Sequence, residues 1–353
     1  MKTTQQQTFP AIDISLALSN RTDKQELCST IKKICHEVGF FIVRNHQVDN
    51  ELSKNAFHYC QQFFDLPLEN KSLIDKTNSR HFRGWEAVGS EYTNNRPDIR
   101  EQIDLWSEHS PATVSNPHYL NLLGPNQWLP DEILPGFKDS ITSYINAMES
   151  LANQLLELLA IGLGLPENYF DDYFGAQRMS LTKLINYPET PAGQFGVNAH
   201  HDTGFLTILN PGETPGLEIE MADGTWQPVP VIADTFVVNL GEMLQAVTGN
   251  YYIATPHRVC TNKKRLSIGY FHGPSLTTPI NRLPLSPEYA KAVNNSPRHK
   301  NAGFMAPISD TESGVGDMQG TLQASTFGDQ LWNYFCRSYP NNVKQYYPEL
   351  VTQ

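Results

Sequence analysis

The chain has 353 residues, of which 39% are hydrophobic, and its 26 basic and 37 acidic residues give a formal net charge of -11. This composition can fill a sizeable core in one large domain or two small ones, and it excludes a disordered chain. The negative charge, with only short basic clusters such as residues 263–265, argues against a phosphate-binding surface. We therefore expect no nucleic acid partner.

The N-terminus and the cysteines indicate a soluble protein of the cytoplasm. Residues 1–7 are polar and lack the apolar core of a signal peptide, and no later stretch reaches the ~18 apolar residues of a membrane span. The five cysteines form an odd set without a Cys-x-x-Cys pair, so we expect free thiols, mostly buried. No membrane partner is predicted.

The N-terminal part of the chain predicts alternating strands and helices. Residues 9–16 are typical of a short edge strand, and residues 23–38 of a helix, because their apolar positions recur at three- and four-residue steps. The apolar segment 40–43 predicts a buried strand. A second helix should follow, with Asn50 or Ser53 as its N-cap.

The middle of the chain contains a long loop and a long helix. Residues 80–110, rich in glycines and aromatics, predict a loop followed by a strand, and residues 111–136 form a connecting loop rich in Pro, Asn and Gly. The longest helical pattern covers residues 137–163 and has one apolar face. We interpret that face as core and not as an oligomer contact, so we expect a monomer.

Short strands separated by turns follow this helix. Residues 180–188 predict the first strand, 216–221 and 224–229 a hairpin, and 235–240 a buried strand. Such a series is typical of a mainly β jelly roll with flanking helices, not of a parallel α/β sheet. Beyond this region the pattern weakens, until a helix is predicted over residues 328–338.

A cluster of metal-binding residue types begins the segment 198–209, which we interpret as the start of a buried strand. Side chains alternate along a strand, so His200 and Asp202 should share one face while His201 points the other way. A lone His-x-Asp is more often a hydrogen-bonded pair than a metal site. His201 could also compete with His200, and a β-bulge at this point would undo the parity argument.

A third donor is available at His257, just before the strand-like residues 263–271. Two imidazoles and one carboxylate on one side of a metal form the arrangement of non-haem Fe(II) oxygenases, which leaves positions open for substrate and O₂. His200, Asp202 and His257 are therefore the candidate metal ligands and catalytic residues.

With Arg265 and Ser267 downstream of these ligands, the chain resembles the isopenicillin N synthase-like family of Fe(II)- and 2-oxoglutarate-dependent oxygenases. That family carries His-x-Asp, a distal His and Arg-x-Ser in this order, and the Gly-Phe-Phe-x-Val-x-Asn-His segment at 39–46 is similar to its N-terminal region. The resemblance implies a double-stranded β-helix core with an N-terminal helical region. It also implies Fe(II), 2-oxoglutarate and O₂ as cofactors. The implied reaction oxidises a C–H bond of a small molecule while 2-oxoglutarate is decarboxylated to succinate.

Four residues are candidates for binding the cosubstrate. Arg265 and Ser267 share one strand face, where a guanidinium can bind the second carboxylate of 2-oxoglutarate through two hydrogen bonds, as lysine cannot. Tyr187 resembles the family tyrosine whose hydroxyl also reaches the cosubstrate, and Lys183 shares its strand face. A role in packing alone remains the alternative for these two residues.

Substrate-binding residues are expected in the least regular segments, 83–93 and the C-terminal helix. The candidates are Glu91, Tyr92, Arg337 and Tyr339. Both segments are similar to those with which bacterial ethylene-forming members of the family hold an amino acid. An ammonium facing Glu91 and a carboxylate facing Arg337 would suit an amino-acid-like ligand. An exposed, salt-bridged helix end is the equally open alternative.

We expect one compact unit with four parts. Residues 1–110 form an N-terminal non-haem dioxygenase region, 111–179 the connecting loop and long helix, 180–275 the catalytic jelly roll, and 276–353 a C-terminal extension. Two other functions stay open: an Fe(II) oxidase of the same fold that does not consume 2-oxoglutarate, and a non-catalytic, metal-dependent module that binds a small acid. The sequence does not distinguish hydroxylation from desaturation or cyclisation.

Overall fold

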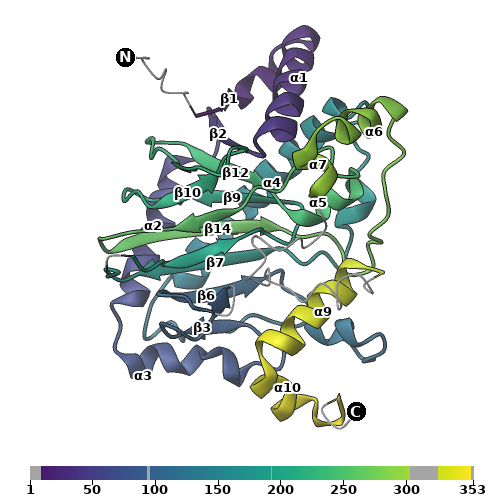
Figure 1. Cartoon of the computed structure of the whole chain (residues 1–353). Coiled ribbons are helices and arrows are strands. Elements are labelled where there is room, and N and C mark those ends of the chain that lie inside the picture. The colour runs from purple at the N-terminus through teal and green to yellow at the C-terminus, as the bar shows by residue number, and fades with distance from the viewer. Residues whose placement is uncertain (1–8, 94–95, 192, 303–324, 351–353) are drawn as a thin grey trace.

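The structure is a computed structural model, which describes residues 9–93, 96–191, 193–302 and 325–350. The polar residues 1–7, and residues 303–324 of the irregular segment expected before the last helix, lie outside the described residues. The centre of the molecule is formed by two β-sheets that pack against each other, with helices on the outside (Figure 1).

Among the described residues, the larger sheet has eight strands. In spatial order they are β1 (Ala11–Asp13), β2 (Phe40–Arg44), β12 (Phe236–Leu240), β9 (Leu206–Asn210), β14 (Arg265–His272), β7 (Leu181–Tyr187), β6 (Glu101–Trp106) and β3 (Gly84–Glu86). β1 and β2 run parallel, and the other neighbouring pairs are antiparallel. Strands from the N-terminal part of the chain thus extend both edges of the catalytic sheet.

The smaller sheet contains four described strands, all antiparallel to their neighbours. In spatial order they are β11 (Trp226–Pro228), β10 (Leu217–Glu220), β13 (His257–Val259) and β8 (Val197–His200). The predicted hairpin is confirmed, because β10 and β11 are paired. A separate ribbon consists of β4 (Tyr92–Thr93) and β5 (Arg96–Pro97).

The expectation of one strand over residues 198–209 is wrong. β8 ends at His200, the chain crosses from the smaller sheet to the larger one, and β9 begins at Leu206. The crossing is held by backbone hydrogen bonds, one of which runs from the Glu242 N–H to the Asp202 carbonyl at 2.7 Å. The sequence pattern does not reveal the crossing, because the residues on both sides of it are strand-like.

Alternating side chains divide the core into two layers, one on each face of the larger sheet. In β2, Phe41 and Val43 pack in the layer that contains the helices, while Phe40 and Ile42 pack against the smaller sheet. The helical layer is formed by α1 (Arg21–Glu37), α2 (Asn50–Phe64) and α4 (Phe137–Gly162). The face of the larger sheet that is free of these helices is the one available for a site between the two sheets.

The structure confirms all three predicted helices; α4 begins at residue 137 as predicted, whereas the starts of α1 and α2 differ from the prediction. α1 begins at Arg21, because the Asn20 side chain accepts hydrogen bonds from two N–H groups of the first turn. Asp49 caps α2 in place of the expected Asn50 or Ser53, since its carboxylate accepts from a first-turn N–H and its backbone is extended. Several candidate capping residues in a row are what made this boundary uncertain.

The remaining described helices lie mostly in the C-terminal part of the chain. They are α3 (Leu68–Lys71), α5 (Glu242–Val247), α6 (Pro287–Asn294), α7 (Pro297–Asn301), α9 (Phe327–Ser338) and α10 (Pro340–Tyr346). α9 confirms the helix predicted over residues 328–338, and Thr326 and Asp329 form a capping box at its start. Figure 1 shows α9 and α10, in yellow, beside the β6 and β3 end of the larger sheet.

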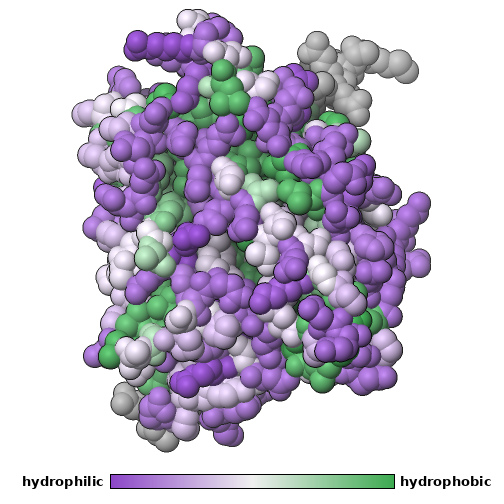
Figure 2. Space-filling view, turned by 180° about the vertical axis from the view of Figure 1, so that it is seen from behind, coloured by the Kyte–Doolittle hydropathy of each residue, from purple (hydrophilic) through white to green (hydrophobic). Residues whose placement is uncertain are grey.

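The surface is mostly polar. On the side opposite to that of Figure 1, hydrophilic residues predominate and hydrophobic ones occur in separate clusters (Figure 2). None of the helices in the described ranges combines the length and the apolar character needed to cross a bilayer.

Candidate metal centre

The three predicted metal ligands meet at the smaller sheet. His200 is the last residue of β8 and His257 the first of β13, and they lie directly opposite each other in this antiparallel pair. Their ring centroids are 4.3 Å apart. Asp202 follows just after β8, and the donor atoms of all three residues lie within 4.8 Å of one another. Two distant segments of the chain thus supply one group of donors.

Backbone carbonyls orient both imidazole rings. His200 Nδ1 lies 2.9 Å from the Asn198 carbonyl oxygen, and His257 Nδ1 lies 3.2 Å from the Thr255 carbonyl oxygen. A carbonyl can only accept, so each Nδ1 carries a proton and donates it, which makes Nε2 the ring nitrogen that can bind a metal ion. These Nε2 atoms face Asp202, whose Oδ1 is 3.7 Å from His200 and 3.5 Å from His257.

Asp202 is oriented through its other oxygen. Oδ2 accepts a hydrogen bond from the Thr207 hydroxyl at 2.5 Å and one from the Asn239 amide at 2.7 Å. Thr207 and Asn239 are partners in the β9–β12 pair, so their side chains lie side by side. Sequence reasoning assigned neither residue to the site. The available signal was a polar side chain within each of two mostly apolar strands.

Burial and neighbouring charges set the protonation states of the three candidate metal ligands. Burial lowers the pKa of His200 to about 3, helped by the nearby His257, so His200 is neutral at pH 7. Burial alone would raise the pKa of Asp202, but the charge and hydrogen bond of His257 outweigh it and hold that pKa below its ordinary value. Burial would lower the pKa of His257, but Asp202 outweighs it and raises that pKa, so a metal ion that binds here takes the place of the proton on His257 Nε2. A neutral imidazole and an ionised carboxylate are the forms that bind metal ions.

The donor set fits a ferrous ion. Two donor atoms about 2.1 Å from one ion and at right angles to each other are about 3 Å apart. The distances of 3.5 and 3.7 Å from the Asp202 carboxylate to the two imidazoles are close to this value. Two imidazoles and one carboxylate are the ligand set of non-haem Fe(II) oxygenases, in which the remaining positions stay open.

His201 lies outside this group. Its Nδ1 is 3.7 Å from the Glu242 carboxylate. In the part of the chain that the structure describes, the one cluster of possible metal ligands contains His200 in its place. Strand parity nevertheless does not explain the choice, because Asp202 lies beyond the end of β8.

A buried guanidinium stands at the start of β14. Arg265 is 2% exposed, its Nη1 donates to the Ser267 hydroxyl at 3.1 Å, and its Nε donates to the Thr214 carbonyl at 3.1 Å. Tyr187 is its partner in the β7–β14 pair, with the ring centroid 5.0 Å from the guanidinium. Over the described ranges no carboxylate forms an ion pair with Arg265. A buried cation without an anion is unfavourable, so this arrangement fits an anionic ligand.

A cavity opens beside the metal ligands, with His200, His201 and Asp202 in its wall. Its charged side chains are Glu91, Arg100, Asp104 and Lys183. Its apolar and aromatic side chains include Trp106, Leu181, Phe271, Leu331 and Tyr334. Of these, Arg100, Asp104 and Trp106 belong to the alternating segment around β6, where sequence reasoning predicted a strand but no site residue.

Glu91 lines this cavity, but its carboxylate has other partners. It accepts hydrogen bonds from Arg100 and Gln102 at 2.6 Å each, from Lys183 at 3.1 Å, and from the Tyr334 hydroxyl at 3.2 Å. Two cations therefore already neutralise it. The expectation that Glu91 faces a ligand ammonium does not fit this geometry, because its acceptor positions are filled.

The other substrate candidates are distributed over different places. Tyr92 lines the cavity and is 62% exposed. Arg337 is exposed in the last turn of α9, and Tyr339 is buried just beyond it; neither lines the cavity. The middle of α9 contributes Leu331 and Tyr334 instead. The part of α9 that lines the cavity is therefore not the part predicted from the sequence, because the angle at which α9 crosses the cavity is a tertiary property.

The side chains of Lys183 and Tyr187 lie in different parts of the site, although both residues belong to β7. Tyr187 is beside Arg265, whereas Lys183 lines the cavity. The Lys183 ammonium is 3.1 Å from Glu91 and 3.3 Å from Asp104. Lys183 therefore lies in the cavity wall and not beside Arg265, and its role in cosubstrate binding stays a prediction.

Comparison with known proteins identifies relatives over nearly the whole chain. A family model described as non-haem dioxygenase in morphine synthesis N-terminal matches residues 9–131, and that of the 2OG-Fe(II) oxygenase superfamily matches residues 176–274. A 2-oxoglutarate-dependent dioxygenase of Gibberella zeae is 30% identical over 365 residues, which cover 98% of this chain and 92% of the relative. A homoarginine-6-hydroxylase of Glycine max is 30% identical over 299 residues, or 78% of this chain and 88% of the relative.

A solved structure shows the same similarity. The crystal structure of a full-length Neurospora crassa protein in complex with alpha-KG and thymine has a TM-score of 0.70 and 26% identity to this chain. The match covers 78% of this chain and 88% of that one.

Fold and site together define a class, a jelly-roll protein whose two histidines and one aspartate can hold a metal ion. Within that class, the chain belongs to the 2OG-Fe(II) oxygenase superfamily. It is an Fe(II)- and 2-oxoglutarate-dependent dioxygenase that uses O₂ and acts on a small molecule. The predicted family, fold and enzyme class are confirmed.

Proposed function

We propose that His200, Asp202 and His257 hold the Fe(II) ion of this dioxygenase. The observation that carries the proposal is the convergence of their donor atoms, each oriented by a hydrogen bond on its far side. The bound iron supplies, with 2-oxoglutarate and O₂, the oxidising power that breaks a C–H bond. The chain contributes three fixed donors and a cavity beside them.

Arg265 and Ser267 are the proposed anchor for the distal carboxylate of 2-oxoglutarate. The guanidinium and the hydroxyl belong to neighbouring positions on one strand face and already contact each other. The Tyr187 ring beside the guanidinium limits its movement, and its hydroxyl is the proposed further donor to the cosubstrate. An ion pair formed here is strong, because burial keeps water from competing for it.

An amino-acid-like molecule is the proposed substrate, and the cavity beside the metal ligands is its proposed site. Two cations, Arg100 and Lys183, and two anions, Glu91 and Asp104, lie in the wall together with aromatic side chains. These charges pair with one another, so the wall suits a polar ligand with a short apolar part and not an ammonium held by Glu91 alone. The relative named as a homoarginine-6-hydroxylase supports this substrate class.

The division into four parts, 1–110, 111–179, 180–275 and 276–353, is proposed to describe one folding unit. In support, β6 of the first part and β7 of the third pair within one sheet.

We further propose a monomer in the cytoplasm without a nucleic acid partner. All five cysteines, which lie within the described residues, are free thiols, as in a reducing compartment. Light scattering after gel filtration measures the mass in solution, and a dimer would contradict the monomer.

The decisive experiment is succinate formation from 2-oxoglutarate with Fe(II) and O₂, in a screen of the free amino acids as substrates. We expect substrate-dependent succinate from the wild type and none from His257→Ala. Arg258→Met is the matched control, since this partly exposed arginine next to His257 pairs with Glu218 outside the cavity. An enzyme that binds 2-oxoglutarate anaerobically, with a visible charge-transfer band, but oxidises no amino acid would overturn the substrate class alone. Absence of both the band and succinate would overturn the ligand assignment.

A further inference from the structure

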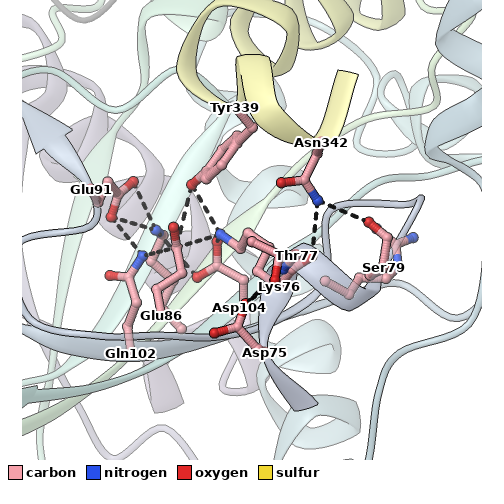
Figure 3. A network of polar contacts seen from close by, with 12 residues as sticks. Asp75, Lys76, Thr77, Ser79, Glu86, Glu91, Gln102, Asp104, Tyr339 and Asn342 are labelled. Carbon is pink, nitrogen blue, oxygen red and sulfur yellow. Dashed lines mark hydrogen bonds and ion pairs between the residues drawn. The ribbon is translucent and has the colours of Figure 1, made fainter. Parts of the chain in front are cut away.

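A buried lysine outside the metal centre joins three parts of the chain (Figure 3). Lys76 is 2% exposed, and its ammonium donates to the Asp104 carboxylate at 2.7 Å, to the Tyr339 hydroxyl at 2.9 Å, and to the Glu86 carboxylate. Glu86 belongs to β3, Asp104 to β6, and Tyr339 directly follows α9. An ammonium has three N–H donors, so three separate elements use all of them.

Two routes lead from this lysine to the wall of the cavity. Asp104 itself lines the cavity, and its Oδ1 lies 3.3 Å from the ammonium of Lys183, which is paired with Glu91 at 3.1 Å. Along the second route, the Gln102 amide donates to Glu86 at 2.9 Å and to Glu91 at 2.6 Å. Both routes end at charged side chains that face the cavity.

Another part of the wall, on α9, is tied to the same lysine. Leu331 and Tyr334 of this helix line the cavity, and the Tyr334 hydroxyl donates to Glu91 at 3.2 Å. At the end of the helix, the Tyr339 ring centroid lies 4.4 Å from the Lys76 ammonium. The position of α9 over the cavity thus depends on contacts at both of these tyrosines.

The charges of the cluster explain why a cation is required at this point. Glu86 and Asp104 are both buried, and both approach Lys76 (Figure 3). A buried carboxylate that loses its partner is strongly disfavoured, so these groups would have to move apart or take up a proton. Either response would displace Asp104, and with it Lys183, in the cavity wall.

We propose that Lys76 is a positioning residue for the substrate, because it fixes the β6 part and the α9 part of the cavity wall relative to each other. The proposal rests on the proposed function in taking this cavity as the substrate site. Asn342 of α10 adds a second tie by donating to the carbonyl oxygens of Lys76 and Ser79 at 3.0 and 3.1 Å. A wall that is already in place lowers the ordering required of the bound complex, so its loss should raise the KM for substrate more than it changes kcat.

Lys76→Met tests the proposal, with Lys71→Met as its matched control. Lys71 is also an ion-paired lysine at this edge of the sheet, 2.8 Å from Glu101 and 5.4 Å from the Trp85 ring centroid. Neither of its partners lines the cavity. Both variants lose an ion pair and should unfold at a lower temperature, so stability alone does not separate them.

Hydrogen exchange of the anaerobic holoenzyme, with Fe(II) and 2-oxoglutarate bound, is the first measurement. We expect the amides of residues 327–346 to exchange more than about tenfold faster in Lys76→Met and at the wild-type rate in Lys71→Met. The KM for 2-oxoglutarate should stay within about twofold of wild type in both variants, since no contact described for Arg265 involves this cluster. The KM for the best amino acid of the screen should rise at least about fivefold in Lys76→Met only.

Unchanged exchange over residues 327–346, or equal acceleration in the two variants, would overturn the proposal. A rise in the KM for 2-oxoglutarate would also overturn it, because it would show general loosening of the fold. Tyr339→Phe removes one hydroxyl and should also accelerate hydrogen exchange over residues 327–346, but to a smaller extent. This variant keeps the test available if Lys76→Met does not fold. A screen without any hit would count against the proposed substrate class, and the exchange comparison would still decide on Lys76.

Discussion

At the scale of single residues, the metal centre depends on groups that hydrogen-bond to its three candidate ligands on the side away from the metal site. Each imidazole donates its Nδ1 proton to the carbonyl two residues before it, while the Asp202 carboxylate is held by Thr207 and Asn239 from two strands of the larger sheet. Such partners fix the direction of the free donor atoms and are part of what gives a metal site its affinity. Arg265 is held in the same way, by Ser267 on its own strand and by the Thr214 carbonyl of a loop.

Asn239→Ala should weaken Fe(II) binding about 10- to 100-fold without abolishing it, because Asp202 Oδ2 loses a hydrogen bond and the carboxylate gains freedom to turn. Anaerobic titration with Fe(II) in the presence of 2-oxoglutarate, followed by the visible band, gives the Kd. Asn186→Ala is the control, since that buried amide donates to Glu101 and not to the ligands. Equal Fe(II) affinity in all three proteins would show that Asn239 does not orient Asp202.

Arg265→Lys should raise the KM for 2-oxoglutarate about 10- to 100-fold, although the charge is kept, because an ammonium does not reproduce a bidentate contact with a carboxylate. Steady-state succinate formation measures this KM. Arg258→Lys provides the comparison, because Arg258 stacks on Trp226 with its guanidinium 4.0 Å from the ring centroid and pairs with Glu218. If both substitutions change the KM to the same extent, Arg265 is not the anchor.

At the scale of elements, the decisive piece is the crossing between β8 and β9. It carries Asp202 out of the smaller sheet, close enough to both imidazoles and to the polar pair on β9 and β12. The crossing passes close to the start of α5, where Gly241 lies against the Gly204 carbonyl. This close contact is possible only without a side chain at that position.

Gly241→Ala should therefore lower both stability and Fe(II) affinity. Its new Cβ would stand 2.1 Å from the Gly204 carbonyl oxygen and 3.1 Å from that of Asp202, so the backbone of the crossing would have to move. Overpacking of this kind costs about 1–3 kcal/mol. Chemical unfolding and the Fe(II) titration are the measurements. Gly175→Ala, whose Cβ would meet the Ser275 hydroxyl at an ordinary 3.5 Å, should leave both unchanged.

At the scale of the whole molecule, the larger sheet separates a helical core from the space between the two sheets. Helices α1, α2 and α4 support one face, so the other face is free to hold the metal ligands, Arg265 and the cavity. β6 and β3, from the N-terminal part of the chain, form one edge of the larger sheet, and α9 lies beside this edge (Figure 1). The site is therefore built from segments of nearly the entire chain.

Ligand binding should consequently stabilise the whole fold. Fe(II) at about a hundred times its Kd should add about 2.7 kcal/mol to the free energy of unfolding, and saturating 2-oxoglutarate should add to this gain. Anaerobic thermal unfolding with Fe(II), then with a chelator added, measures the effect. His257→Ala should show no gain from Fe(II). A wild type whose Tm is the same with Fe(II) and with chelator would argue against a native metal centre at these residues.

The sequence by itself determined the residue types of the centre and most elements of the fold. The His-x-Asp pair at 200–202 and the Arg-x-Ser pair at 265–267 are local patterns, and helices such as α4 follow from apolar periodicity alone. These features depend on interactions between residues near each other in the chain, which is why they could be predicted.

Tertiary structure decided the rest. The break between β8 and β9, the pairing of Thr207 with Asn239, and the part of α9 that faces the cavity all depend on how distant strands and helices meet. Glu91 shows the consequence most clearly, because the cations and the tyrosine that fill its acceptor positions come from separate places in the chain. Local sequence specifies what a residue can donate or accept, whereas the partner that it finds is set by packing of the complete chain.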